Sequence, residues 1–130
     1  MDLESETYAI IGAAMEVHSC LGKGYLEAVY QEAMVLEMTD RGIPFVGQPK
    51  MRIDYKGHTL SKFYVPDFLA FDLIPIELKA HSEPLSKADM KQILNALRTC
   101  GGSIGLIFNY GRASLDYRRV MLSASLSESH

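Results

Sequence analysis

Two carboxylates and a lysine stand close together in the middle of the sequence. Asp67 follows a proline at the end of one apolar run, and Glu77 and Lys79 lie in the next run. Side chains of a strand alternate between its faces, so Glu77 and Lys79 should point one way while Ile76 and Leu78 point the other. A tight return between two adjacent strands would bring Asp67 to the same level. The spacing therefore predicts two carboxylates and one lysine around a single pocket.

Such a set suits a divalent cation and a phosphate group. Mg²⁺ binds hard oxygen ligands, usually one or two carboxylates together with waters and phosphate oxygens. A bound dication lowers the pKa of its water and stabilises charge on phosphoryl oxygens. A nearby lysine can orient or deprotonate that water, or balance charge on the phosphorus. The alternative is that Glu77 and Lys79 form the solvated face of an amphipathic strand, and the spacing alone leaves both interpretations open.

Length and composition are those of a small globular protein. The 130 residues are enough for one domain with a core, and the formal net charge of -3 argues against a strongly basic nucleic-acid-binding surface. Cys20 and Cys100 are isolated in the sequence, so we expect buried, reduced thiols rather than a zinc site or a disulfide. We predict a single domain over residues 1–122 and a disordered, serine-rich tail over residues 123–130.

The start of the sequence bears on location. It reads Met-Asp-Leu-Glu-Ser-Glu, which is acidic and lacks an apolar segment, so we expect no signal peptide. No apolar run is long enough to cross a membrane. We therefore expect a cytoplasmic protein with no membrane partner.

The pattern over residues 3–20 predicts a first helix with an unusually wide apolar surface. Two neighbouring stripes follow its length: Ile10, Ala14, Val17 and Leu21 form one, and Tyr8, Ile11, Met15 and His18 form the other. This is more apolar surface than one core requires, so we expect a second copy of the chain to cover part of it in a homodimer.

A second helix is predicted over residues 25–39. Its expected apolar stripe is Leu26, Val29, Tyr30, Ala33 and Leu36. Glu27 falls beside this stripe in the first turn, where a glutamate ordinarily complements the helix dipole.

Three strands in a meander are predicted for the middle of the chain. Residues 48–55 and 59–71 would form two of them, joined by a hairpin turn. Pro66, just before Asp67, suggests a sheet edge or a bulge because proline cannot donate to a ladder. Residues 76–80 would form the third, buried strand.

The remainder predicts a helix over residues 87–99, capped by Ser86, and then a wholly apolar strand over residues 103–109. The segment 115–122 fits either a short strand or a helix. The order α-α-β-β-β-α-β predicts an α/β fold in which helices flank a mixed central β-sheet on both faces.

Residues 24–30, Gly-Tyr-Leu-Glu-Ala-Val-Tyr, resemble the defining motif of the GxxExxY proteins. These belong to the PD-(D/E)xK, or restriction-endonuclease-like, nuclease superfamily. The similarity covers roughly residues 5–120 and continues through four further segments: 66–67, 76–79, 92–95 and 105–109. This ordered combination is specific, whereas Glu-x-Lys alone would be a weak signal. The resemblance implies a restriction-endonuclease-like core.

The resemblance also implies roles for individual residues. For the divalent ion, Mg²⁺ or Mn²⁺, it implies a set of ligands: Asp67, Glu77, the carbonyl of Leu78, and Glu27. Lys79 would be the catalytic lysine, and Gln92 would lie near the substrate or its water. Tyr30 fits a packing role better than a catalytic one.

Two functions stay open on the sequence. The first is metal-dependent hydrolysis of phosphodiester bonds in nucleic acid, with DNA favoured over RNA, in DNA processing or defence. The second is a catalytically inactive binding module, or a subunit of a larger nucleic-acid-processing assembly. The acidic balance and Ala96, at a position where related nucleases often carry an aromatic residue, favour the second.

Overall fold

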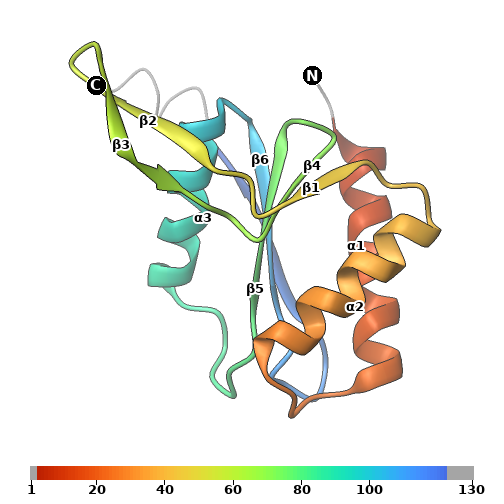
Figure 1. The fold of residues 1–130 in the computed structure, drawn as a ribbon. Helices are drawn as coiled ribbons and strands as arrows, with labels where there is room; N and C mark the ends of the chain where they lie inside the picture. Colours follow the sequence, from red (N-terminus) through yellow and green to blue (C-terminus); the bar gives the residue numbers. More distant parts are fainter. Residues whose placement is uncertain (1–2, 123–130) are drawn as a thin grey trace.

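The structure is a computed structural model that describes residues 3–122. The predicted tail, residues 123–130, lies outside this part. The elements in chain order are α1 (Glu4–Leu21), α2 (Glu27–Asp40), β1 (Phe45–Gly47), β2 (Met51–Tyr55), β3 (His58–Tyr64), β4 (Phe68–Ala70), β5 (Ile74–Lys79), α3 (Lys87–Cys100), β6 (Ile104–Asn109) and β7 (Asp116–Met121). Figure 1 shows how they are arranged.

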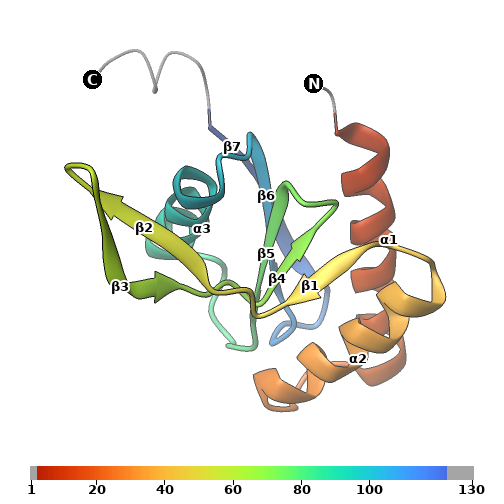
Figure 2. The same cartoon turned by 45° about the horizontal axis from the view of Figure 1, so that its top comes forward.

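A mixed sheet forms the centre of the molecule. Within residues 3–122 it has five strands in the order β1-β4-β5-β6-β7. β5 and β6 run parallel and are connected through α3, while the other neighbouring pairs are antiparallel. α1 and α2 lie on one side of the sheet and α3 on the other (Figures 1 and 2). The predicted α/β class and the helices on both faces are confirmed.

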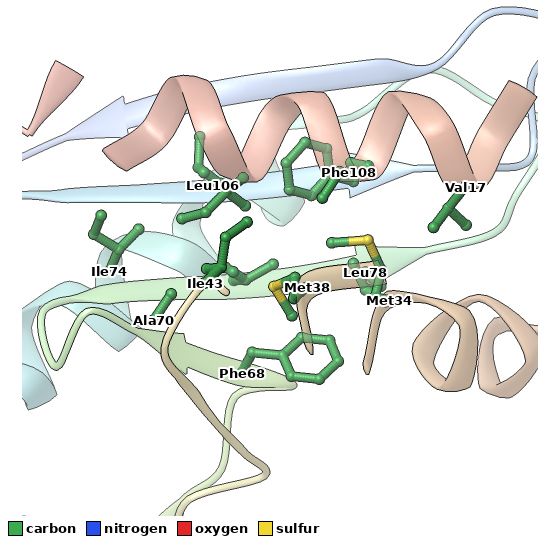
Figure 3. Packing of buried hydrophobic residues seen from close by; sticks show 14 of the residues in the cluster. Val17, Met34, Met38, Ile43, Phe68, Ala70, Ile74, Leu78, Leu106 and Phe108 are labelled. Carbon is green, nitrogen blue, oxygen red and sulfur yellow. The ribbon is translucent and has the colours of Figure 1, made fainter. Parts of the chain in front are cut away.

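The larger core lies between the sheet and the two N-terminal helices. Alternate residues of β5 and β6 point into it, and α1 and α2 supply its other wall (Figure 3). Its fully buried large side chains include Ile10, Tyr30, Met34, Met38, Phe68, Ile74, Ile76, Leu78 and Phe108.

The stripe predicted for α2 was partly wrong. Leu26, Val29 and Leu36 are exposed, whereas Tyr30 is buried as predicted. The other buried residues of α2 are Met34 and Met38, which were not part of the predicted stripe. Tyr30, Met34 and Met38 follow each other at intervals of four, so they form one ridge that packs on the core, and Ala33 packs beside them.

On the opposite face, α3 packs directly against the sheet. Ile93, Ala96 and Leu97 are buried there. A Cβ on Gly105 would lie 2.8 Å from Cγ1 of Ile93, so the close approach of helix and strand requires glycine at this position. Ser86 caps the helix as predicted, because its side chain accepts the backbone N–H of Asp89.

The predicted three-stranded meander was wrong. β2 and β3 form a two-stranded sheet of their own, and β4 pairs instead with β1 and β5. The expected strand 59–71 is split between Tyr64 and Phe68, where Pro66 has no N–H to donate, so Pro66 marks a break rather than an edge. Figures 1 and 2 show the hairpin projecting on the side of α3, away from α1 and α2.

Two further expectations are settled by the structure. The segment 115–122 forms a strand, β7, so the order of described elements is α-α-β-β-β-β-β-α-β-β. Cys20, predicted to be buried, is exposed, because it lies on the outer side of α1 with its Sγ 3.2 Å from a carboxylate oxygen of Glu16. Among residues 3–122 no helix combines the length and apolar character needed to cross a bilayer.

Candidate functional site

Asp67, which directly precedes β4, lies opposite Glu77 of the neighbouring strand β5. Phe68 of β4 is paired with Ile76 of the antiparallel strand β5. Asp67 directly precedes Phe68, and Glu77 directly follows Ile76, so the two acidic residues are neighbours across the strands. The Asp67 backbone N–H donates to Oε1 of Glu77 at 3.3 Å, and the Leu78 N–H donates to Oδ2 of Asp67 at 2.7 Å. The structure therefore brings together the two carboxylates that the spacing predicted to be neighbours.

The alternation along β5 explains why Glu77 and Lys79 share a face. Ile76 and Leu78 enter the core beneath α1 and α2, which turns the two charged residues toward the α3 side. Glu77 is only 4% exposed and Lys79 is half-buried. The solvated-face interpretation is therefore wrong for Glu77, which lies in the protein interior.

Tyr64 connects the hairpin to this site. Its hydroxyl is 2.7 Å from Oε2 of Glu77 and 3.0 Å from the backbone carbonyl oxygen of Gln92. A phenol has one proton to donate, so at any moment it serves only one of these two acceptors. Tyr64 thus links β3, β5 and α3 at the buried carboxylate. This contact was not predicted from the sequence, although Tyr64 lies only three positions before Asp67.

Burial dominates the electrostatics of the two carboxylates. It raises the pKa of Glu77 to about 7, with a smaller rise from the charge of Asp67 and an opposing effect of the Tyr64 hydrogen bond. Burial also raises the pKa of Asp67, against the effects of the Leu78 N–H and the Lys79 charge. The pKa of Tyr64 is raised by burial too, so its hydroxyl stays protonated and able to donate. The raised pKa values mean that the negative charges of ionised Asp67 and Glu77 are not fully compensated by their neighbours. A cation bound between the two carboxylates would therefore be favoured.

Glu27 approaches the same site from the start of α2. The residue is exposed, but partial desolvation of its carboxyl raises its pKa, and the negative charge of Asp67 raises it further. The charges of Lys79 and His81 act in the opposite direction. The carboxyl of Glu27 is therefore within electrostatic range of both members of the predicted site, Asp67 and Lys79.

The rest of the Gly-x-x-Glu-x-x-Tyr segment fixes the start of this helix. Gly24 has a φ of +114°, which a residue with a Cβ rarely adopts. The Tyr30 hydroxyl donates to the Gly22 carbonyl at 2.6 Å and accepts the Tyr25 N–H at 3.3 Å. Its ring is fully buried and stacks on Tyr110, with centroids 4.5 Å apart. The packing role predicted for Tyr30 agrees with these contacts, and Glu27 lies one turn before it.

Asn109 organises the loop that follows Lys79. The side chain is fully buried; its Oδ1 accepts the His81 N–H at 3.0 Å, and its Nδ2 donates to the Glu83 carbonyl at 2.9 Å. The Tyr110 N–H donates to the Lys79 carbonyl at 2.8 Å. The sequence predicted only a core strand here, because a polar residue at a strand end gives no sign of which loop it binds.

Gln92 and Ala96 lie on α3, beside the site. The backbone carbonyl of Gln92 is held by Tyr64, which places the helix against Glu77, and the residue is half-buried. Ala96 is fully buried against the sheet, so this position serves the packing of α3.

The donor set fits a hard divalent cation. Among residues 3–122 no three His, Cys, Asp or Glu side chains converge closely enough to hold a metal by themselves. Mg²⁺ commonly uses only one or two carboxylates and completes its octahedron with waters and phosphate oxygens. The buried carboxylate of Glu77 and the adjacent, half-buried carboxylate of Asp67 offer only oxygen donors. They match that requirement and not that of a zinc site, which prefers nitrogen and sulfur ligands.

A mixed sheet flanked by helices, with an Asp just before one strand and Glu-x-Lys on the adjoining strand, defines a restriction-endonuclease-like protein. The model of the PD-(D/E)XK nuclease superfamily matches residues 4–120, and the chain belongs to this superfamily. Membership implies a nucleic-acid substrate. No curated protein and no solved structure matches the chain.

Proposed function

We propose that the protein is a metal-dependent nuclease that hydrolyses phosphodiester bonds, with DNA preferred over RNA. The observation that carries this proposal is the placement of Asp67 opposite the buried Glu77, with Lys79 on the same face of β5. These three residues supply oxygen ligands for a dication and a cation for the phosphate, which is the minimum that such a reaction needs.

Asp67 and Glu77 would hold the ion, Mg²⁺ or Mn²⁺, with the carbonyl of Leu78 as a further ligand and Glu27 reaching the site from α2. When bound, the ion would supply charge stabilisation on the phosphate and a water of lowered pKa. The N–H of Leu78 and the hydroxyl of Tyr64 keep the two carboxylates in place before any ligand arrives.

Lys79 would orient the attacking water and balance the charge that develops on the phosphate oxygens. In the reaction a bond forms between the water oxygen and phosphorus, the bond to one bridging oxygen breaks, and the leaving oxygen takes up a proton. Gln92 would lie near the attacking water. We also propose that the chain belongs to the GxxExxY group of the superfamily, on the strength of residues 24–30, and that it serves DNA processing or defence.

The proposal is tested by incubating plasmid, linear and branched DNA, and RNA, with the protein and Mg²⁺ or Mn²⁺. Lys79→Ala and Asp67→Ala should each abolish cleavage, while Lys91→Ala, on the exposed side of α3, should leave it unchanged. Cleavage that survives in both site variants would refute the nuclease proposal. Binding of nucleic acid and metal without cleavage by the wild type would favour the inactive binding module.

We further propose a homodimer formed through α1. Tyr8 and Met15 are 79% and 47% exposed, and they border a hollow of about 620 Å³ that is lined also by Ile11, Glu16 and Arg119. Apolar side chains with both signs of charge around them suit a two-fold contact of this surface with itself. Sedimentation of the wild type at micromolar concentration should show a dimer, and Met15→Glu should show a monomer. A monomeric wild type would contradict the proposal.

A further inference from the structure

For most of its length, the β2–β3 hairpin does not bury its side chains against the rest of the molecule. It leaves the main sheet, and nearly all of its side chains are exposed, including the whole stretch from Asp54 to Phe63. An isolated two-stranded hairpin is at best marginally stable, so an arm of this kind is usually stabilised by something that it contacts. The arm begins and ends beside the candidate site, because Tyr64, its last residue, binds Glu77.

The hairpin carries a charge opposite to that of the chain as a whole. From residue 50 to residue 64 there are four cationic side chains, Lys50, Arg52, Lys56 and Lys62, against one carboxylate, Asp54. The difference is a net charge of +3, in a chain whose formal net charge is -3. All five of these side chains belong to exposed residues. A local basic surface on an acidic protein favours a polyanionic partner at this place.

Exposed aromatic rings accompany the cations. Phe63 is 47% exposed and Tyr55 is 58% exposed. The Lys50 Nζ lies 5.9 Å from the centroid of the Phe63 ring, and the Lys56 Nζ lies 5.4 Å from that of Tyr55. Basic side chains that follow a backbone, next to aromatic faces on which bases stack, are the usual means by which proteins bind single nucleic-acid strands.

The register places three of these residues on one face at the base of the arm. Arg52 pairs with Phe63, so their side chains lie on the same side of the hairpin, and Lys50 reaches over the same ring. The next pair, Met51 and Tyr64, points to the other side, where Met51 is buried and Tyr64 contacts Glu77. The patch formed by Lys50, Arg52 and Phe63 is therefore fixed to the site through adjacent residues of the same two strands.

We propose that the β2–β3 hairpin is the arm that holds the nucleic-acid strand entering the site, with phosphates on Lys50 and Arg52 and a base stacked on Phe63. This inference rests on the proposed nuclease function, because it assigns the surface that binds the substrate of that same site. Phosphate contacts of this kind give affinity without sequence preference, and the ring gives a preference for unpaired bases.

The test uses fluorescence anisotropy with labelled single-stranded and duplex oligonucleotides, at several salt concentrations, in a Lys79→Ala background that prevents cleavage. The test variant is Lys50→Gln with Arg52→Gln. A matched control removes the same charge by Arg41→Gln with Arg118→Gln. Both residues are exposed; Arg41 is the C-cap that follows α2, and Arg118 lies in β7. Thermal unfolding of each protein checks that it folds.

The test variant should bind at least tenfold more weakly at about 0.1 M salt. The slope of log affinity against log salt concentration should become shallower by about 1.8 for duplex DNA and by about 1.4 for single strands, because two phosphate contacts are lost. The control should keep the slope of the background protein. Phe63→Ala should weaken binding of single strands about 5- to 160-fold without altering the salt dependence.

Two outcomes would overturn the inference, and they are distinguishable. If the background protein binds nucleic acid and the hairpin variants bind as tightly as the control, the arm is not the binding surface, although the nuclease proposal stands. If neither the background protein nor the wild type in EDTA binds nucleic acid, the proposed function fails and the inference fails with it.

Discussion

Replacing Glu77 with glutamine should make the folded protein more stable at alkaline pH and nearly as stable at acidic pH. The pKa of about 7 in the folded chain, against 4.5 for an ordinary glutamate, means that folding takes up a proton between these values. The stabilisation of the folded state by the protonated carboxyl is fully present below about pH 4.5 and is lost as the pH rises through about 7. At about 1.4 kcal/mol for each unit of pH, the loss reaches about 3 kcal/mol.

Glutamine has the shape of the protonated acid and cannot ionise, so Glu77→Gln should not suffer this loss. Its amide oxygen can still accept a hydrogen bond from Tyr64 or from the Asp67 N–H. Urea unfolding from pH 5 to pH 9, in the presence of EDTA, measures the free energy of unfolding. Wild type and variant should agree near pH 5, and the variant should be about 2 to 3 kcal/mol more stable near pH 8.5. Glu32→Gln, on the exposed side of α2, is the control and should follow the wild type.

The same unfolding experiment with Mn²⁺ in place of EDTA gives a second readout. A cation bound to ionised Glu77 should restore stability to the wild type at pH 8.5, by about 2.7 kcal/mol at a concentration one hundred times its dissociation constant. It should have little effect on Glu77→Gln. A wild type whose stability does not change from pH 5 to 9, or a variant that follows the wild-type curve, would refute the buried-carboxylate reasoning.

Two further substitutions test the groups around the site. Tyr64→Phe removes the hydrogen-bond donor that lowers the pKa of Glu77, so the pKa of Glu77 should rise. The pH at which Mn²⁺ binding is half-maximal, measured by calorimetry, should therefore increase by about one unit. An unchanged midpoint would show that Tyr64 does not support the carboxylate. Tyr30→Phe loses the hydrogen bond to the Gly22 carbonyl, and the free energy of unfolding should fall by about 1 to 2 kcal/mol. Equal stability of wild type and Tyr30→Phe would contradict the role assigned to that hydroxyl.

The local features of the site could be predicted from the sequence because they depend on the period of a strand. Alternation alone places Glu77 and Lys79 on one face and Leu78 on the other, and the return through residues 71–73 brings Asp67 opposite Glu77. The capped third helix was equally readable, since Ser86 and Gly101 mark its two ends.

The hairpin and the contacts of the site could not be predicted in the same way. The pattern of residues 48–71 is that of paired strands, but nothing in it says whether β2 and β3 join the main sheet. Tyr64 reaches Glu77 across 13 positions and Gln92 across 28, so both contacts depend on how three separate elements pack. The burial of Glu77 has the same origin, because neighbouring elements and not β5 itself exclude water.

The central claim is that Asp67 and Glu77 share one divalent cation. A crystal structure of the wild type soaked in Mn²⁺ at about pH 8, with anomalous diffraction data, tests it most directly. The account predicts a manganese peak about 2.1 to 2.2 Å from an oxygen of each carboxylate, as expected for Mn²⁺ with oxygen ligands, and no peak in Asp67→Ala. A wild-type crystal with both carboxylates ordered and no peak between them would contradict it.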